Sequence, residues 1–257
     1  MPALQAQELT KYYASIPAVK DVTFRVQGGE VLGCLGPNGS GKSTTVKMLM
    51  GLLEPTRGRV LFDGADIRRD LVGYRKQVGY VPEEPNLYPY LTGREYIDLI
   101  GTLRGMDRVV LEKKVNDLLE LFALHPYRHS PISSYSKGMR QRILLIAALI
   151  GNPSILILDE PLSGLDAVSA LIVKSLIRDL ASRGRTVFYC SHVLEVVEKV
   201  CTAIMILRLG SVIALTGVQD LPRISAKASL EETFAHLVQS ADPIEVSRDI
   251  FDVMTSA

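Results

Sequence analysis

The segment GPNGSGKST, at residues 36–44, combines glycines with a lysine and hydroxyl side chains at a spacing that can bind phosphate groups. Its glycines let backbone N–H groups surround a polyphosphate without clashes from Cβ atoms. Lys42 is placed to contact the β- and γ-phosphates, and the Ser43 hydroxyl is placed to hold Mg²⁺. The run therefore predicts a phosphate-binding loop (P-loop) made of Gly36, Pro37, Asn38, Gly39, Ser40, Gly41, Lys42, Ser43 and Thr44.

A phosphate-binding loop of this kind lies between a buried strand and a helix, and the flanking residues have both patterns. The apolar run EVLGCLG, at residues 30–36, indicates a buried strand, and residues 42–53 have helical spacing. The start of a helix favours anions through its free N–H groups and its dipole. The dinucleotide-binding pattern G-x-G-x-x-G does not fit, because Thr44 takes the place of its last glycine.

Two acidic residues follow a second apolar run, in ILILDEP at residues 155–161. Open α/β sheets bind ligands at the carboxyl ends of their strands, so Asp159 and Glu160 are expected beside the phosphate-binding loop. Asp159 is a candidate ligand in the Mg²⁺ shell, and Glu160 is a candidate general base for an attacking water. An Asp-Glu pair alone is more often a solvated turn, but the loop in the same chain favours the functional interpretation.

A third segment, YSKGMRQR at residues 135–142, precedes the apolar run ILLIAALI. Ser136 has the residue type and the position of a helix N-cap, which would make this helix start another anion site. Most capping serines only cap, so these residues alone leave both interpretations open.

Strand patterns alternate with helical patterns along the chain, which favours an α/β fold with a parallel sheet. Helical spacing dominates residues 91–150, so a helical subdomain is expected between the strands. The other predicted strands lie at residues 22–26, at 58–67 around an Asp63-Gly64 hairpin, at 186–191 and at 203–210, and a further helix lies at 167–183.

These motifs occur in the order found in the ATP-binding subunits of ATP-binding cassette (ABC) transporters, which the chain resembles over about residues 9–210. GPNGSGKST is similar to the Walker A motif of that family, ILILDEP to Walker B, and YSKGM to the signature usually written LSGGQ. SGLD, which ends at Asp166, resembles the D-loop, and His192 resembles the switch histidine. Tyr13 is similar to the aromatic residue that stacks on adenine, although packing on the strands stays open for it.

The resemblance implies a P-loop NTPase core with a mixed, mainly parallel sheet, an antiparallel β subdomain and an inserted helical subdomain. We expect an ABC ATPase domain at residues 1–215, with its core at about 1–88 and 151–215 and its helical subdomain at about 89–150. A C-terminal helical tail is expected at residues 216–257.

The resemblance also implies that ATP and Mg²⁺ bind, and that ATP is hydrolysed between two chains paired head to tail. Ser136 and Gly138 would donate to the γ-phosphate held by a second copy or by a paralogous ATPase subunit. His192 would contact the γ-phosphate, and Asp166 would communicate across the dimer. Glu83 stands where the family usually has glutamine, and its carboxylate keeps an oxygen for Mg²⁺ or water.

The composition argues against several classes of protein. The 257 residues include 29 Lys and Arg and 28 Asp and Glu, a formal net charge of +1, so no nucleic-acid partner is expected. The 3 cysteines form no CxxC pair, which disfavours a disulfide framework and a zinc site. No apolar stretch reaches the length of a membrane span, about 20 residues, so any transport pathway must belong to another protein.

We therefore expect a cytoplasmic ATPase subunit, peripheral on the inner face of the cell membrane, that powers translocation by a separate transmembrane permease. The segment EEPNLYPYLTGREY, at residues 83–96, resembles subunits of bacterial exporters. Within it, residues 85–94 are either a packed loop or the rim of a groove for the permease. The alternatives are a soluble ABC ATPase that acts on ribosomes or DNA, and a small-molecule kinase, which would not need the second anion site.

Overall fold

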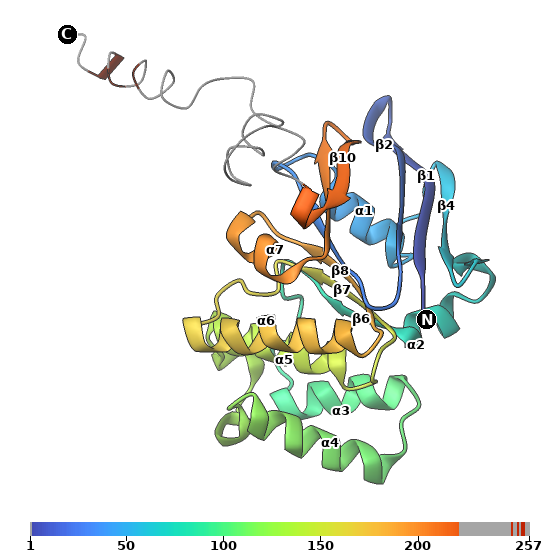
Figure 1. Ribbon diagram of the computed structural model, residues 1–257. Helices are drawn as coiled ribbons and strands as arrows, with labels where there is room; N and C mark the ends of the chain where they lie inside the picture. Colours follow the sequence, from blue (N-terminus) through green and yellow to red (C-terminus); the bar gives the residue numbers. More distant parts are fainter. Residues whose placement is uncertain (1, 221–247, 249–250, 252, 255–257) are drawn as a thin grey trace.

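Two β-sheets form the framework of the molecule (Figure 1). The computed structural model describes residues 2–220, 248, 251 and 253–254, so the predicted C-terminal tail lies largely outside the described residues. A four-stranded sheet has the order β2-β1-β4-β5, and a six-stranded sheet has the order β10-β9-β3-β8-β7-β6. The strands are β1 (Leu4–Tyr13), β2 (Ile16–Val26), β3 (Val31–Leu35), β4 (Arg57–Phe62), β5 (Ala65–Asp66), β6 (Val78–Val81), β7 (Ile155–Asp159), β8 (Thr186–Cys190), β9 (Ala203–Arg208) and β10 (Ser211–Gly217).

The helices lie on both sides of the six-stranded sheet and in a separate layer beyond it (Figure 1). They are α1 (Lys42–Leu49), α2 (Leu71–Gln77), α3 (Gly93–Leu103), α4 (Arg108–Leu121), α5 (Lys137–Leu149), α6 (Ala167–Ser182) and α7 (Leu194–Val200). Short 3₁₀ turns occur at Ile67–Arg69, His125–Tyr127, Ile132–Ser134 and Val218–Asp220.

The six-stranded sheet is parallel except at one edge. The strands β9, β3, β8, β7 and β6 run in the same direction, and β10 is antiparallel to β9. Every residue of β7 and β8 is buried, which explains why both segments read as continuous apolar runs rather than alternating ones. The predicted α/β class, with a mainly parallel sheet and an antiparallel subdomain, is confirmed.

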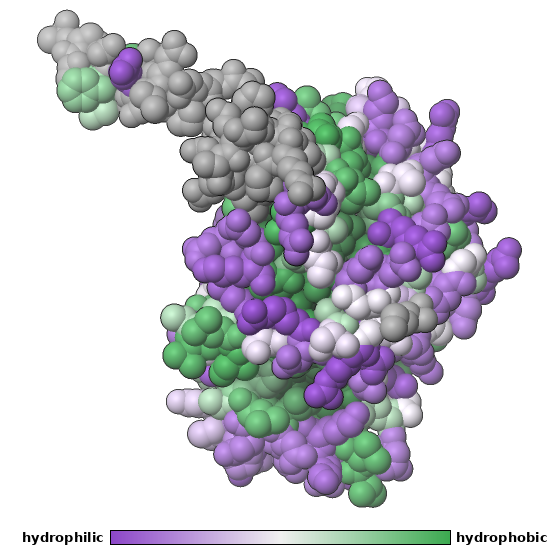
Figure 2. Space-filling model, in the orientation of Figure 1, coloured by the Kyte–Doolittle hydropathy of each residue, from purple (hydrophilic) through white to green (hydrophobic). Residues whose placement is uncertain are grey.

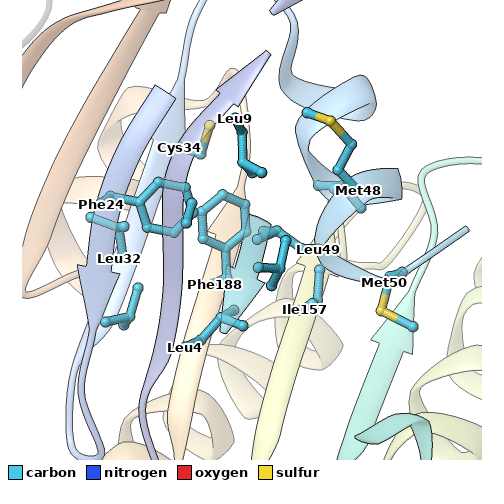
Figure 3. Packing of buried hydrophobic residues seen from close by; sticks show 14 of the residues in the cluster. Leu4, Leu9, Phe24, Leu32, Cys34, Met48, Leu49, Met50, Ile157 and Phe188 are labelled. Carbon is cyan, nitrogen blue, oxygen red and sulfur yellow. The ribbon is translucent and has the colours of Figure 1, made fainter. Parts of the chain in front are cut away.

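One hydrophobic core fills the space between the two sheets and α1 (Figure 3). Phe24 of β2 stacks on Phe188 of β8 with ring centroids 5.3 Å apart. Leu49 of α1 and Ile157 of β7 point into the same cluster. This core fixes α1, and therefore the loop that precedes it, to the end of the parallel sheet.

The opposite face of the sheet is covered by α5, α6 and α7, which contribute Leu144, Ile177 and Val197 to a second core. Further out, α3 and α4 pack on α5 around Ile97, Val115 and Ile143 to form a third core. The helix α5 belongs to both cores. It therefore joins the inserted helical subdomain, at the bottom of Figure 1, to the sheet.

Local boundaries differ from the sequence prediction in two places. Helix α1 ends at Leu49 rather than at residue 53, because Gly51 turns the chain with a left-handed φ of 62°. The predicted hairpin at residues 58–67 is confirmed, since β4 and β5 pair antiparallel on either side of the Asp63-Gly64 turn. The last strand, β10, continues to Gly217, so it extends past residue 215, where the ATPase domain was expected to end.

Candidate active site

The loop of residues 36–44 joins the end of β3 to the start of α1. A Cβ atom at Gly41 would lie 2.6 Å from the Ala18 carbonyl oxygen, and Gly41 has a φ of 105°, so this position requires glycine. Gly41 is also the N-cap of α1, and it has no side chain to occupy the free N–H groups of the helix start. The loop and the helix therefore present backbone donors to an anion.

Lys42 lies in the first turn of α1 and folds over the loop. Its Nζ donates to the carbonyl oxygens of Gly36, at 2.6 Å, and of Pro37, at 3.1 Å. The Lys42 ammonium group is thus held against the backbone of the loop. A polyphosphate bound there would meet both kinds of positive group.

The order of the strands brings the other predicted residues to the same place. Because β3, β8, β7 and β6 are neighbours and parallel, the segments that follow them meet at one edge of the sheet. A pocket of about 280 Å³ opens at this edge. It is lined by Ala18, Asn38, Gly39, Gly41, Lys42, Ser43, Thr44, Glu83, Asp159, Glu160 and His192.

Glu160 is held by donors from the segment after β8. Its Oε1 lies 2.6 Å from His192 Nδ1 and accepts the backbone N–H of His192 at 2.8 Å. Its Oε2 accepts the Ser191 hydroxyl at 3.1 Å. Glu160 has a left-handed φ of 48°, a strained conformation of the kind that is common at functional sites. Ser191 was missed by the sequence analysis, although a hydroxyl beside His192 at a strand end was the available signal.

Asp159 is 4% exposed, and its environment disfavours its charge. Burial, together with the carboxylates of Glu83 and Glu160, raises the pKa of Asp159 from 3.8 to about 6, while Lys42 opposes the shift. A divalent cation would relieve this repulsion, and the carboxylate and hydroxyl oxygens nearby are the donors that Mg²⁺ prefers. Among the described residues, no group of three or more His, Cys, Asp or Glu side chains could hold a metal ion alone. This donor set fits Mg²⁺, which keeps several waters and shares phosphate oxygens as ligands.

Gly36, Pro37 and Ser40 belong to the loop but do not line this pocket, and four predicted residues outside the loop lie away from it. Ser136 caps α5, and its Oγ accepts the N–H of Met139 at 3.2 Å, while Gly138 lies in the first turn of that helix. Asp166 caps α6 and accepts the N–H of Ser169 at 2.9 Å. Tyr13 ends β1 and is 50% exposed. One chain therefore brings the loop, Glu83, Asp159, Glu160 and His192 together, and leaves these four residues apart.

Comparison with known proteins finds a matching family model and relatives that are similar in sequence. A family model described as "ABC transporter" matches residues 19–163. The linearmycin resistance ATP-binding protein LnrL of Bacillus subtilis (strain 168) is 36% identical over 218 residues, which cover 85% of this chain and 70% of LnrL.

Two solved structures have similar folds. One, the ATP binding subunit of an ABC transporter, is 33% identical with a TM-score of 0.86, and the match covers 91% of this chain and 98% of that one. The other is a dimer of the ATP-binding cassette MJ0796 in a post-hydrolysis state, bound to ADP and Pi. It is 27% identical with a TM-score of 0.78, and the match covers 84% of this chain and 98% of the MJ0796 chain.

Proposed function

The chain belongs to the ABC transporter family as an ATP-binding subunit with ATPase activity, and from this premise we propose how its residues carry out the reaction. The phosphates of ATP lie along the loop of residues 36–44, where backbone N–H groups and the start of α1 receive them. Lys42 exchanges the carbonyl oxygens of Gly36 and Pro37 for β- and γ-phosphate oxygens, which are charged acceptors and bind an ammonium more strongly.

Asp159 and Ser43 would hold Mg²⁺ in this proposal, and Glu83 would contribute directly or through a water. When bound, the ion supplies positive charge that offsets the charge on the β- and γ-phosphates. It also favours the ionised form of Asp159, whose pKa is otherwise raised by burial and by its acidic neighbours.

The pairing of Glu160 with His192 in the same pocket as Lys42 is the observation that carries the proposal. Glu160 orients a water molecule and accepts its proton as the water oxygen bonds to the γ-phosphorus and the bond to the ADP oxygen breaks. His192 Nδ1 is engaged by Glu160, which leaves Nε2 for the γ-phosphate. Removal of the γ-phosphate therefore changes the contacts of both residues.

A second chain completes the site in this proposal. Ser136 and Gly138 lie at the start of α5, where backbone donors and the helix dipole favour an anion, but they are outside the pocket of their own chain. Head-to-tail pairing places this helix start against the γ-phosphate of the other chain, and Asp166 lies next to that contact. The similar cassette MJ0796 is a dimer in its post-hydrolysis state, which supports the pairing of two chains.

Transport requires a membrane subunit, and the segment that leads into α3 offers a surface for it. Among the described residues, no helix combines the length and the apolar composition needed to cross a bilayer. Tyr90 is 91% exposed, and Tyr88 is exposed but rests against Tyr96 with ring centroids 6.3 Å apart. Figure 2 shows apolar patches on the helical half of the molecule. These exposures favour a docking groove over a fully packed loop.

The permease would hold this subunit at the inner face of the membrane. The name of LnrL, a resistance protein, and the exporter-like segment at residues 83–96 favour export as the direction of transport. Both observations are analogies with other proteins, and the substrate would be selected by the permease.

The direct test replaces the carboxylate that accepts the proton. Glu160→Gln is expected to lower ATP hydrolysis at least about 100-fold, because the amide cannot act as a base, while a fluorescent ATP analogue still binds. The variant should also form a dimer with ATP, as followed by light scattering. Glu198→Gln, on the exposed face of α7, is the matched control and should hydrolyse ATP at the original rate. Full activity of Glu160→Gln would contradict the assignment.

A further inference from the structure

A buried glutamine joins the helix that carries Ser136 to the segment that carries Glu160. Gln141 of α5 is 2% exposed, and its Nε2 donates to the carbonyl oxygen of Pro161 at 3.0 Å. A buried amide without a partner is unfavourable, so this hydrogen bond fixes how α5 and Pro161 lie against each other. Pro161 directly follows Glu160.

Two further contacts hold the same pair of segments together. A Cβ atom at Gly138 would lie 2.6 Å from the carbonyl oxygen of Gly164, so the first turn of α5 touches the backbone of the D-loop. The aliphatic stem of Lys137 also packs against Gly164, where a Cβ atom would lie 2.8 Å from Lys137 Cγ. Gln141 lies four residues after Lys137 and three after Gly138, so it neighbours both on the surface of α5, because helical positions three and four residues apart share a face.

The backbone at Glu160 needs such support. Glu160 has a φ of 48°, and it precedes a proline, which further restricts its conformation. Its N–H donates to the Cys190 carbonyl at 3.0 Å, which anchors the side of β8. The hydrogen bond from Gln141 anchors the following residue from the side of α5. The strained residue is thus fixed between two elements.

We propose that Gln141 is a positioning residue that holds the Glu160 carboxylate in place through Pro161. This inference rests on the proposed role of Glu160 as the base. Gln141 does not line the pocket, so it should affect the rate of the chemical step and leave nucleotide affinity unchanged. It also makes the position of Glu160 depend on α5, the helix whose start would grip the ATP of the second chain.

The test compares Gln141→Leu with Gln141→Glu in the full chain, each assayed for kcat and KM between about pH 6 and pH 9. Leucine has a similar size and no donor, so kcat should fall about tenfold while KM changes less than twofold. A protonated glutamic acid can donate to the Pro161 oxygen, but its carboxylate cannot. The kcat of Gln141→Glu, divided by the wild-type value at each pH, should therefore fall as pH rises, whereas the ratio for Gln141→Leu should stay flat.

Dividing by the wild-type rate removes the pH dependence that all the proteins share. Tyr74→Phe is the matched control, because it removes another buried hydrogen bond, from the Tyr74 hydroxyl to the Leu49 carbonyl at 2.8 Å. This control should lower the melting temperature and keep the wild-type kcat.

Wild-type kcat in Gln141→Leu would overturn the inference, and so would a flat pH ratio in Gln141→Glu. The pH ratio of Gln141→Glu needs only that variant and the wild type, so the test remains decisive if Gln141→Leu does not fold. Glu160→Gln is assayed in parallel. If it is inactive while Gln141→Leu is fully active, the positioning role fails and the proposed function stands.

Discussion

At the scale of single residues, the surroundings of Asp159 disfavour the negative charge of its carboxylate. The carboxyl group is buried, and its neighbours Glu83 and Glu160 carry the same sign, so its pKa is raised from 3.8 to about 6. Between about pH 4 and pH 6 the folded chain therefore binds more protons than the unfolded chain. The free energy of unfolding falls as pH rises through this range, by up to about 3 kcal/mol in total.

Asp159→Asn should remove this pH-dependent penalty when nucleotide and divalent cations are absent. We expect the variant to be more stable than the original chain by about 1–3 kcal/mol near pH 8, and to differ little from it near pH 4. Urea unfolding in the presence of a chelator measures both values. With Mg²⁺ and ATP added, the original chain should gain more stability than the variant, because Asp159 is the proposed ligand of the ion. An equal loss of stability in the variant at both pH values would contradict the prediction.

At the scale of elements, α5 and the D-loop touch so closely at Gly138 that a side chain does not fit there. Gly138→Ala would place a methyl group 2.6 Å from the Gly164 carbonyl oxygen, and this backbone oxygen can move only if the turn moves. The displacement should cost about 1–3 kcal/mol and shift the segment after Glu160. We expect about tenfold lower ATPase activity with unchanged affinity for a fluorescent ATP analogue. Wild-type kcat in this variant would show that the contact is not tight.

The residues that line the pocket could be predicted from the sequence, whereas the hydrogen bonds from Gln141 and Ser191 that support them could not. The phosphate-binding loop and the acidic pair at residues 159–160 follow from local spacing and from the rule that parallel strands end at one edge. Gln141 and Ser191 act through residues far away in the sequence, and no local pattern marks which residue they contact. Strand β1 was also not delimited, since register shifts at residues 6–12 interrupt its alternation.

At the scale of the whole molecule, the functional groups divide into two sets that face different places. The pocket contains Lys42, Asp159, Glu160 and His192, while Ser136 and Asp166 cap helices outside it. A single chain therefore presents these two sets at different places. In the proposed pair of chains, each helix start completes the site of the other chain. The hydrogen bond from Gln141 then couples the position of Glu160 in each chain to α5, the helix whose start contacts the nucleotide of the other chain.

The segment between Glu83 and α3 should connect this reaction to the membrane subunit. Tyr90 is 91% exposed, so Tyr90→Asp should leave the fold and the ATPase activity of the isolated subunit within about twofold of the original. A buried charge at the docking surface would weaken the complex by a few kcal/mol. The control is Val109→Asp, a residue 77% exposed in the first turn of α4, where an acidic side chain is tolerated.

The measurement is retention of each variant by its membrane subunit, purified in detergent, together with stimulation of ATPase activity by that subunit. We expect Tyr90→Asp to lose at least about 10-fold in affinity, which corresponds to about 1.4 kcal/mol, while Val109→Asp binds normally. The isolated subunits report whether either variant has lost its fold or its own activity. Normal retention and stimulation of Tyr90→Asp would place the docking surface elsewhere on the molecule, since a charge on a side chain this exposed would have to be buried by any partner that covers it.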